Sequence, residues 1–140
     1  MIHFLFYISE SLLSLIEQEK QVEAIVSWSH GWNPAFGITG ALVFTQQHFV
    51  QFIEGPQVAI DDLIARIRRD SRHRNVNVML EGESEVRRFE NWSLAYHGPE
   101  LFLADKIEAL VRSVDPETAT RSAEELVLLM QAFTASDRHT

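Results

Sequence analysis

The sequence predicts one α+β domain with the ferredoxin-like split βαβ arrangement, extended by a fifth strand and two C-terminal helices. The order of the predicted elements is β-α-β-β-α-β-β, which is that arrangement with one added strand. The predicted strands are apolar at nearly every position, as expected for a sheet covered on both faces. At 140 residues, 46% apolar and 23% charged, the chain has the size and composition of one globular domain. We expect residues 1–97 to form its core and residues 98–140 a helical segment of the same compact domain.

The first half of the chain supplies three strands and one helix. Residues 2–9 (IHFLFYIS) are rich in aromatic and β-branched side chains, which favours a strand. A helix is predicted from about Leu12 to His30, and Gly31 is expected to end it. Its apolar repeat is Val22, Ile25, Val26 and Ser29. Residues 37–44 (GITGALVF) and 48–55 (HFVQFIEG) are predicted strands, joined by a three-residue hairpin loop.

The second half adds two strands and three helices. Pro56 suits the first turn of a helix whose apolar stripe is Ile60, Leu63, Ile64 and Ile67. Residues 76–80 (VNVML) and 91–97 (NWSLAYH) are predicted strands on either side of a charged stretch. Two further helices follow, the second beginning at Asp115-Pro116, with these stripes: Leu103, Ile107, Leu110, Val111 and Val114, then Leu126, Leu129, Met130 and Phe133. The first two helices are expected on one sheet face, and the last two on the other face or against a second subunit.

Composition excludes several classes of protein. The chain has no cysteine, so disulfides and thiolate metal sites are excluded, and a cytoplasmic location is expected. It has no apolar run of about 18 residues, so we expect no membrane span. Its apolar N-terminus lacks a basic region and a cleavage site, and we interpret it as a strand, not a signal peptide. The net charge of −8 argues against nucleic acid as a partner.

The positive charges are concentrated in one segment. Five of the twelve Lys and Arg side chains lie between Arg66 and Arg74, and only Lys20 precedes them. A positive patch on an acidic protein favours a small anionic ligand, and the alternative is a solvated helix end. The six histidines have no metal-ligand spacing, and no serine lies in a nucleophile elbow. Gly40 in GITG is expected to mark close packing or ligand approach within a strand. Nothing here indicates turnover chemistry.

Two polar side chains are predicted inside the apolar sheet. Gln51 shares a strand face with Phe49 and Ile53, and Tyr7 lies at the centre of the first strand. A buried amide or hydroxyl costs stability unless it forms a hydrogen bond. The simplest interpretation is that Tyr7 and Gln51 bond to each other and have no further role. Asn33, before Pro34, is by the same reasoning an ordinary cap or turn residue.

Five segments together favour a specific interpretation. They are YIS at 7–9, N-x-x-x-GITG at 33–40, F-x-Q-F-I-E-G at 49–55, I-x-x-D-x-RH at 67–73 and R-F-x-x-W at 88–92. In this order and spacing, the chain resembles the BLUF family, the flavin-binding sensors of blue light, over about residues 2–97. The resemblance implies a flavin held between the first two helices above the sheet. It is usually FAD, and FMN or riboflavin remain alternatives.

The resemblance also implies roles for individual residues. Gln51 matches the glutamine that bridges the flavin ring and a tyrosine, which is Tyr7 here, and Asn33 matches the residue bonded to the polar edge of the ring. The other implied contacts are Ile38 and Ile67 on the ring faces, and Arg66, Asp70, Arg72 and His73 near the ribityl chain and phosphate. After blue light, Tyr7 would supply an electron and then a proton. Gln51 would rearrange by rotation or tautomerisation and change the hydrogen bonds at the flavin.

The implied signal passes through the last strand and the C-terminal helices to an unidentified partner protein, with no enzyme attached and with a homodimer or higher homo-oligomer expected. The chain departs from the family at Leu94, where methionine is usual, and at the bulky Trp28 and Trp32. Trp32 or Trp92 close to the flavin would compete with Tyr7 as electron donor. Two other functions are considered: a light-insensitive binding or oligomerisation module with weak flavin loading, and an acyl-phosphate hydrolase that uses the arginines.

Overall fold

Nine helices and strands make up the described part of the chain. The computed structural model describes residues 1–97 and 101–137, and leaves the side chains of 95–97, 101–103 and 135–137 undescribed. The elements are β1 (Ile2–Ser11), α1 (Gln18–Ala35), β2 (Thr39–Phe44), β3 (His48–Gly55), α2 (Gln57–Arg69), β4 (His73–Ser84), β5 (Trp92–His97), α3 (Leu101–Arg112) and α4 (Pro116–Asp137).

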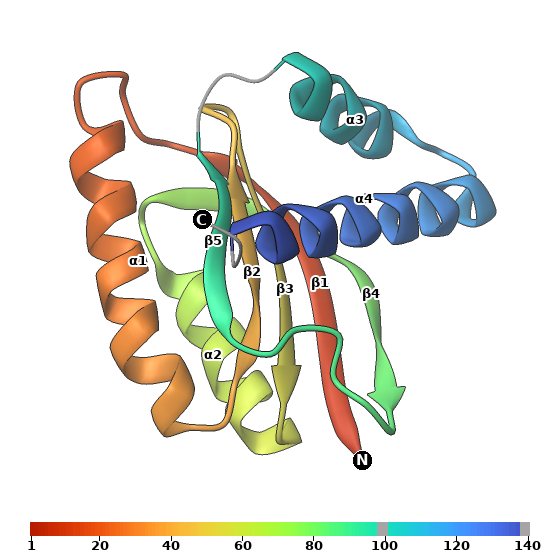
Figure 1. Cartoon of the computed structure of the whole chain (residues 1–140). Coiled ribbons are helices and arrows are strands. Elements are labelled where there is room, and N and C mark those ends of the chain that lie inside the picture. Colours follow the sequence, from red (N-terminus) through yellow and green to blue (C-terminus); the bar gives the residue numbers. More distant parts are fainter. Residues whose placement is uncertain (98–100, 138–140) are drawn as a thin grey trace.

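The five strands form one sheet in the order β4-β1-β3-β2-β5. Strand β3 is antiparallel to both β1 and β2, so it lies inside the split βαβ unit, and β4 pairs antiparallel with the other edge of β1. Strand β5 is the added strand and runs parallel to β2. This topology confirms the predicted ferredoxin-like fold with a fifth strand. Figure 1 shows α1 and α2 on one side of the sheet and α4 crossing the other side, with α3 beside it.

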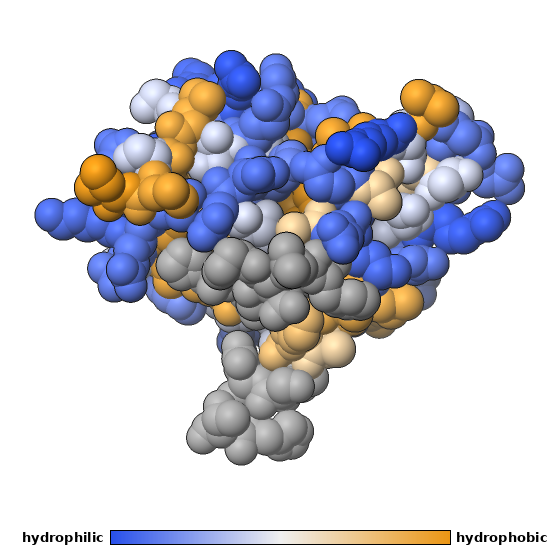
Figure 2. Space-filling model, turned by 90° about the horizontal axis from the view of Figure 1, so that it is seen from above, coloured by the Kyte–Doolittle hydropathy of each residue, from blue (hydrophilic) through white to orange (hydrophobic). Residues whose placement is uncertain are grey.

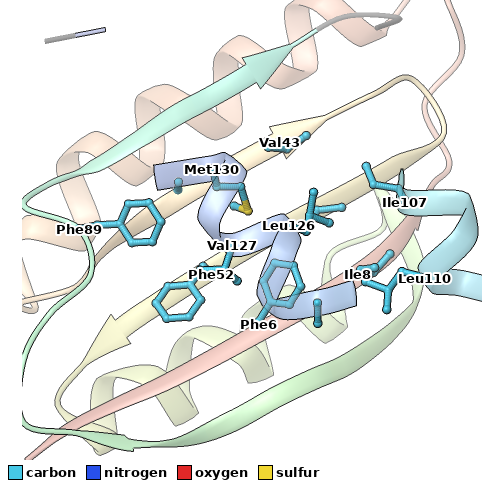
Figure 3. Packing of buried hydrophobic residues seen from close by; sticks show 13 residues of the cluster. Phe6, Ile8, Val43, Phe52, Phe89, Ile107, Leu110, Leu126, Val127 and Met130 are labelled. Atoms are coloured by element: carbon cyan, nitrogen blue, oxygen red, sulfur yellow. The ribbon is translucent and has the colours of Figure 1, made fainter. Parts of the chain in front are cut away.

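Each sheet face has its own apolar core, because successive strand residues point to opposite faces. Phe6, Ile8, Val50 and Phe52 pack with buried side chains of α3 and α4, among them Ile107, Leu110, Leu126 and Met130 (Figure 3). Leu5, Tyr7 and Ile53 pack on the opposite face against Ile60 and Leu63 of α2. A third cluster joins Val22 of α1 to Leu42, Phe49 and Trp92. The prediction that helices cover both faces is therefore confirmed.

The predicted limits of the first helix are wrong at both ends. Ser14 and Glu17 close a turn immediately before the helix, in which the Ser14 hydroxyl donates to Glu17 Oε1 at 2.9 Å and the Glu17 amide donates to Ser14 Oγ at 3.3 Å. The preceding residues therefore remain a loop, and Gln18 begins α1. At the other end the helix continues through Gly31, whose absent side chain leaves open space, and the chain turns at Gly37 with φ of +72°.

Strand β4 is longer than the predicted segment 76–80 because it lies at the sheet edge. Its charged side chains point to solvent without loss of pairing to β1, so part of the charged stretch belongs to the strand. Val111 and Val114, predicted on the stripe of the third helix, are exposed. Leu103 of the same stripe lies outside the described side chains. None of the described helices combines the length and apolarity that a membrane span requires.

Gly40 marks close packing between strands, one of the two roles expected for it. A Cβ atom at this position would lie 1.9 Å from the backbone oxygen of Phe52, and φ is +151°. Only glycine lets β2 approach β3 this closely. The contact holds β2 beside the strand that carries Gln51.

Candidate functional site

The two buried polar residues of the sheet face each other across neighbouring strands. Tyr7 of β1 is the register partner of Gln51 of β3, and the Tyr7 hydroxyl donates a hydrogen bond to Gln51 Oε1 at 2.8 Å. The side chains are 2% and 5% exposed. The Gln51 carbonyl is thereby satisfied, whereas its Nε2 group has no hydrogen-bond partner among the described residues. An amide donor thus remains for a ligand above the sheet.

The position of Tyr7 fixes its protonation state. Burial raises the pKa of the phenol well above its ordinary value, and the negative charge of Asp70 raises it further. The desolvated phenolate is disfavoured, so the hydroxyl stays protonated and continues to donate to Gln51 across the physiological pH range.

A small cavity lies above this pair, between α1 and α2. Its volume is about 60 Å³. Six predicted site residues line it: Tyr7, Gln51, Ile67, Asp70, Arg72 and His73. They come from β1, β3, α2, the turn after α2 and the start of β4, so segments far apart in the sequence meet here. Asn33, Ile38, Arg66 and Trp92 do not line this cavity.

His73 is held at the floor of the site by both ring nitrogens. Nε2 lies 2.8 Å from the backbone oxygen of Ile67, and Nδ1 lies 2.7 Å from the Ser9 hydroxyl. A carbonyl oxygen only accepts, so Nε2 carries the proton and Nδ1 accepts from Ser9. Burial lowers the pKa of His73, although the Ile67 carbonyl and Asp70 act in the opposite direction. The ring is therefore a neutral wall next to Tyr7 and Phe49, which it meets edge-on.

Asp70 and Arg72 form a two-pronged ion pair at the mouth of the cavity. Arg72 Nε lies 2.9 and 3.1 Å from the two carboxylate oxygens, and Nη2 lies 2.6 Å from Oδ2. Burial of Asp70 opposes ionisation, but the hydrogen bonds and charge of Arg72 hold its pKa below the ordinary value. Arg66, by contrast, pairs with Asp62 at 3.3 Å on the helix surface and lies over the Trp32 ring.

Asn33 has the most unusual environment of the predicted residues. The prediction that it follows the helix is wrong, because it lies in the last turn of α1. Its side chain is fully buried, and neither its Oδ1 nor its Nδ2 has a hydrogen-bond partner among the described residues. It therefore does not act as a cap. Each buried group without a partner costs about 1–3 kcal/mol, so this amide is suited to bonding a ligand.

Ile38 and Trp92 do not line the small cavity, although each packs with residues that do. Both are buried, and both line a separate hollow at the end of α1 near β5. Trp92 packs with Leu42 and Phe49, meets His30 edge-on, and has a buried Nε1 without a partner among the described residues. Trp92 is therefore separated from the Gln51 strand by β2, shares a packing cluster with Phe49, and lies outside the cavity.

Three aromatic side chains stack in a column along α1. Trp28 stacks on Trp32 with ring centroids 5.2 Å apart, and Trp32 stacks on Phe36 at 4.4 Å. Trp28 lines the cavity and is 44% exposed, which makes it a rim residue.

Several cavity residues were not predicted as site residues. They are Ile25, Trp28, Ser29, Leu42, Phe49 and Leu63. Most of them are apolar and indistinguishable in sequence from ordinary core positions. Ser29 is the exception: a buried hydroxyl on the apolar stripe of α1 was a signal that this stripe faces more than a hydrophobic core. Strand alternation places Ser9, which bonds His73, on the same face as Tyr7, but its partner lies 64 residues away in the sequence.

The polar and apolar groups of the cavity suit a flavin ring, but the volume of the cavity is too small for one. A flavin ring has polar edges and apolar faces, and the cavity offers the amide nitrogen of Gln51 beside apolar walls, whereas the unpartnered amide of Asn33 does not line it. The cavity of about 60 Å³ is nevertheless below the 300–1,000 Å³ usual for ligand pockets. A ring can enter only if side chains on α1 and α2, such as Trp28 and Ile67, move outward. Among the described residues, no cluster of His, Asp or Glu is placed to hold a metal ion.

Comparison with known proteins gives a consistent result. Residues 2–95 match the family model of BLUF, described as sensors of blue light using FAD. The chain is 34% identical over 73 residues to the blue light- and temperature-regulated antirepressor BluF of Escherichia coli (strain K12), covering 52% of this chain and 18% of that protein. It is 31% identical over 99 residues to the photoactivated adenylate cyclase subunit alpha-like protein FB of Euglena gracilis, covering 69% and 9%. The matched region spans less than a fifth of each curated relative.

Solved structures agree with this result. The dark-state structure of the BLUF protein BlrB superposes with a TM-score of 0.73 at 28% identity, covering 96% of both chains. BlrP1 of Klebsiella pneumoniae, solved with FMN and cyclic diGMP, gives a TM-score of 0.66 at 28% identity, covering 93% of this chain and 34% of that one. The family match extends over more than half of the residues, so this chain belongs to the BLUF family of flavin-using blue-light sensors.

Proposed function

We propose that this chain is a blue-light photoreceptor in which Tyr7 and Gln51 convert light absorption into a change of hydrogen bonding. The observation that carries the proposal is the buried 2.8 Å hydrogen bond from the Tyr7 hydroxyl to Gln51 Oε1, facing the cavity between α1 and α2. When bound there, a flavin supplies blue-light absorption and an excited state that accepts an electron. The side chains of Tyr7 and Gln51 are proposed to supply the electron and the proton and to change the hydrogen bonds.

Tyr7 supplies the electron and its proton. Its raised pKa keeps the proton on the neutral phenol in darkness. Once the phenol loses an electron, the hydroxyl becomes a strong acid, and the nearest acceptor is Gln51 Oε1 at 2.8 Å. The proton therefore leaves along the existing hydrogen bond, and no water is needed in this buried position.

The Gln51 amide is the group whose hydrogen-bond pattern is proposed to differ between the dark and the illuminated protein. Its amide has an acceptor at one end and two donors at the other, so rotation or tautomerisation exchanges what it presents to Tyr7 and to the ring. Once the electron and the proton have returned to Tyr7, either rearrangement would leave different hydrogen bonds at the flavin and an unchanged covalent structure. We infer that the result is a small red shift of the absorption spectrum, reversed in darkness.

The remaining site residues are proposed to bind and orient the flavin. Asn33 bonds the polar edge of the ring, Ile38 and Ile67 pack on its faces, and Asp70 with Arg72 borders the ribityl chain. His73 contributes a neutral wall held by Ser9. Trp92 is proposed to influence the site from its position beside Phe49, where it is a competing electron donor.

The cofactor is proposed to be FAD. The family description names FAD, which supports this assignment, whereas the BlrP1 structure contains FMN. The ring contacts described above are common to FAD, FMN and riboflavin, so they do not separate the three.

The output is proposed to pass from the sheet to β5 and to the C-terminal helices, and from there to a partner protein or a second copy of the chain. The support is that α3 and α4 pack on the opposite face of the strands that carry Tyr7 and Gln51. Light-minus-dark hydrogen exchange tests this: we expect changed protection in both β5 and α4, and identical protection in light and darkness would refute it.

The decisive experiment is the absorption spectrum of the flavin-loaded protein in darkness and after blue light. We expect a reversible red shift, and Tyr7→Phe and Gln51→Leu should retain the flavin but lose the shift. A protein that stays colourless after flavin reconstitution, or a yellow protein with a light-independent spectrum, would contradict the proposal. The second result would instead support a light-insensitive binding module.

A further inference from the structure

A hollow lies on the face of the sheet opposite Tyr7 and Gln51, at the end where β1 stops and β3 begins. Ile8 of β1 and Val111 of α3 line it, and its volume of about 330 Å³ is within the usual range for small-molecule sites. In Figure 1 this is the upper end of the sheet, beside α3. We call it the α3 hollow. It shares no described lining residue with the cavity above Tyr7 and Gln51.

Part of the α3 hollow is apolar. Ile8 belongs to the core cluster of this sheet face, Met79 packs against that cluster, and Val111 is 51% exposed. Figure 3 shows Ile8 beside Leu110 of α3. Figure 2, seen from above, shows apolar side chains in small groups among hydrophilic ones at this end of the molecule. The hollow therefore offers a hydrocarbon surface to a ligand.

His48 is the polar residue that indicates a ligand. It lies directly across from Glu10 in the pairing of β3 with β1, so both side chains point to the α3 face, as Ile8 does. His48 is only 8% exposed, and its ring forms no hydrogen bond with the described residues. A buried polar group without a partner is unfavourable, and a ligand in the hollow would supply that partner.

The charge of the hollow favours a cation. The hydrogen bond from Asn75 lowers the pKa of Glu10, as do the charges of Arg74 and His48, although desolvation acts in the opposite direction. Glu10 is therefore ionised at neutral pH. Arg74 lies 3.5 Å from Glu10 Oε1, but its side chain is 63% exposed and does not line the hollow, so this ion pair is weak. The net charge of −8 adds to the attraction for a cation.

The polar atoms of the hollow include several acceptors. Asn75 Nδ2 donates to Glu10 Oε2, which leaves Asn75 Oδ1 without a hydrogen bond to the described residues. The unprotonated nitrogen of the His48 ring also accepts, and the Glu10 carboxylate has further lone pairs. These groups match the three N–H donors of a primary ammonium ion, and the apolar part of the hollow adjoins them.

We propose that the α3 hollow binds a primary amine that carries an apolar body. The ammonium group donates to Glu10, His48 and Asn75, and the body packs on Ile8 and Val111. Two sources share this chemistry: a free organic amine, and the side chain of a lysine on a partner protein. The inference does not require a flavin, so its failure leaves the proposed light response untouched.

The test is titration of the isotope-labelled full chain with three probes of equal chain length, n-hexylamine, n-hexanol and n-hexanoate. Amide chemical shifts give both the dissociation constant and the location of binding. We expect hexylamine to bind about tenfold more tightly than hexanol, and hexanoate to bind most weakly. The shifted amides should be those around Glu10, His48 and Asn75. Equal affinities for the amine and the alcohol, or shifts confined to other segments, would overturn the inference.

A peptide distinguishes the two sources of the amine. Acetyl-leucyl-lysyl-leucyl amide carries the same ammonium group on a lysine side chain. Tighter binding of this peptide than of hexylamine would support a lysine of a partner protein as the ligand, and weaker binding would support a free amine. A peptide with norleucine in place of lysine that binds equally well would overturn the ammonium contact.

Substitutions separate the charge from the apolar contact. Glu10→Gln should weaken hexylamine about tenfold and leave hexanol unchanged, and His48→Leu should weaken hexylamine about threefold. Val111→Ser should weaken the amine and the alcohol by the same factor, because it removes a contact with the hydrocarbon body that both probes share. A loss of hexanol binding in Glu10→Gln as large as the loss of hexylamine binding would contradict the assigned role of the carboxylate.

Glu81→Gln is the matched control. Glu81 also contacts a buried histidine, with His3 Nε2 at 3.1 Å from Oε2, and His3 is 8% exposed like His48. Glu81 lies on β4 but does not line the α3 hollow. This variant should bind all three probes as the unchanged protein does. An equal loss of hexylamine affinity in Glu10→Gln and Glu81→Gln would reduce the effect to net charge and overturn the inference.

Discussion

Asn33→Leu should have opposite effects on the flavin-free and the flavin-bound protein. Leucine has nearly the shape of asparagine, so the substitution removes the polar atoms and little else. In the flavin-free protein, Asn33 buries an amide oxygen and an amide nitrogen without a partner among the described residues. At about 1–3 kcal/mol for each group, removal of both should raise the free energy of unfolding by about 2 kcal/mol.

For a chain of this length, a gain of about 2 kcal/mol corresponds to a melting temperature about 6 °C higher. The same change removes two proposed hydrogen bonds to the flavin. At about 1 kcal/mol each, their loss should weaken binding about thirtyfold. Thermal unfolding of the flavin-depleted protein measures the first effect, and titration with FAD measures the second.

Thr45→Val is the matched control. Thr45 Oγ1 is also buried without a partner among the described residues, but Thr45 lies in the turn between β2 and β3 and does not line the cavity. This variant should gain stability without a change in flavin affinity. The assignment of Asn33 to the flavin is refuted if Asn33→Leu keeps full affinity for FAD, and the unsatisfied amide is refuted as a source of instability if the flavin-free variant melts at a lower temperature.

Three further predictions follow from packing and protonation. Gly40→Ala should lower the free energy of unfolding by more than about 3 kcal/mol, because its Cβ would meet the Phe52 oxygen at 1.9 Å. Gly31→Ala, which faces open space inside α1, should raise the free energy of unfolding by about 0.5–1 kcal/mol. Urea unfolding measures both, and similar effects of the two variants would refute the packing argument. Glu54→Gln should cost about 2 kcal/mol in the same assay, since Glu54 is a buried carboxylate that accepts several hydrogen bonds; an unchanged midpoint would contradict this. Because the pKa of His73 is lowered in the folded protein, the unfolded chain takes up the proton first as the pH falls. The stability contributed by the neutral ring is therefore complete above about pH 6.5 and declines below it. His73→Gln should flatten the pH dependence of the free energy of unfolding, and an unaltered slope would exclude this role.

The central pair was predictable from the sequence because strand geometry determines it. The alternation of β1 and β3 places Tyr7 and Gln51 on defined faces, and an amide in an apolar strand requires a partner. The antiparallel register then makes the two residues direct neighbours. No long-range information was needed beyond the prediction that the two strands pair.

The position of Asn33 was not predictable in the same way. Gly31 is a local signal for a helix end, but the cost of glycine inside a helix is only about 1 kcal/mol, and packing of α1 on the sheet exceeds it. The helix therefore continues for one more turn and carries Asn33 into the interior. The Ser9–His73 bond depends equally on how β4 meets β1, which local patterns do not specify.

The arrangement of β3 explains how a change at Gln51 can reach the opposite face of the sheet. Gln51 points toward α1 and α2, whereas its neighbours Val50 and Phe52 belong to the cluster that packs on α3 and α4. A close-packed core transmits small displacements because it has few voids to absorb them. Any shift of the β3 backbone that follows rearrangement of the Gln51 amide therefore displaces Val50 and Phe52 against the side chains of α4.

A second connection starts three residues further along β3. Glu54 accepts hydrogen bonds from the backbone amides of Arg88, at 2.9 Å, and Phe89, at 2.7 Å, and thereby fixes the segment before β5. Arg88 in turn pairs with Glu124 of α4 at 3.1 Å, and its backbone oxygen accepts from Gln131 Nε2 at 3.2 Å. One strand thus holds both the entry to β5 and the side of α4 through polar contacts of defined length. A displacement of β3 cannot leave these contacts unchanged, which is why we expect β5 and α4 to respond together in the hydrogen-exchange test and not one without the other.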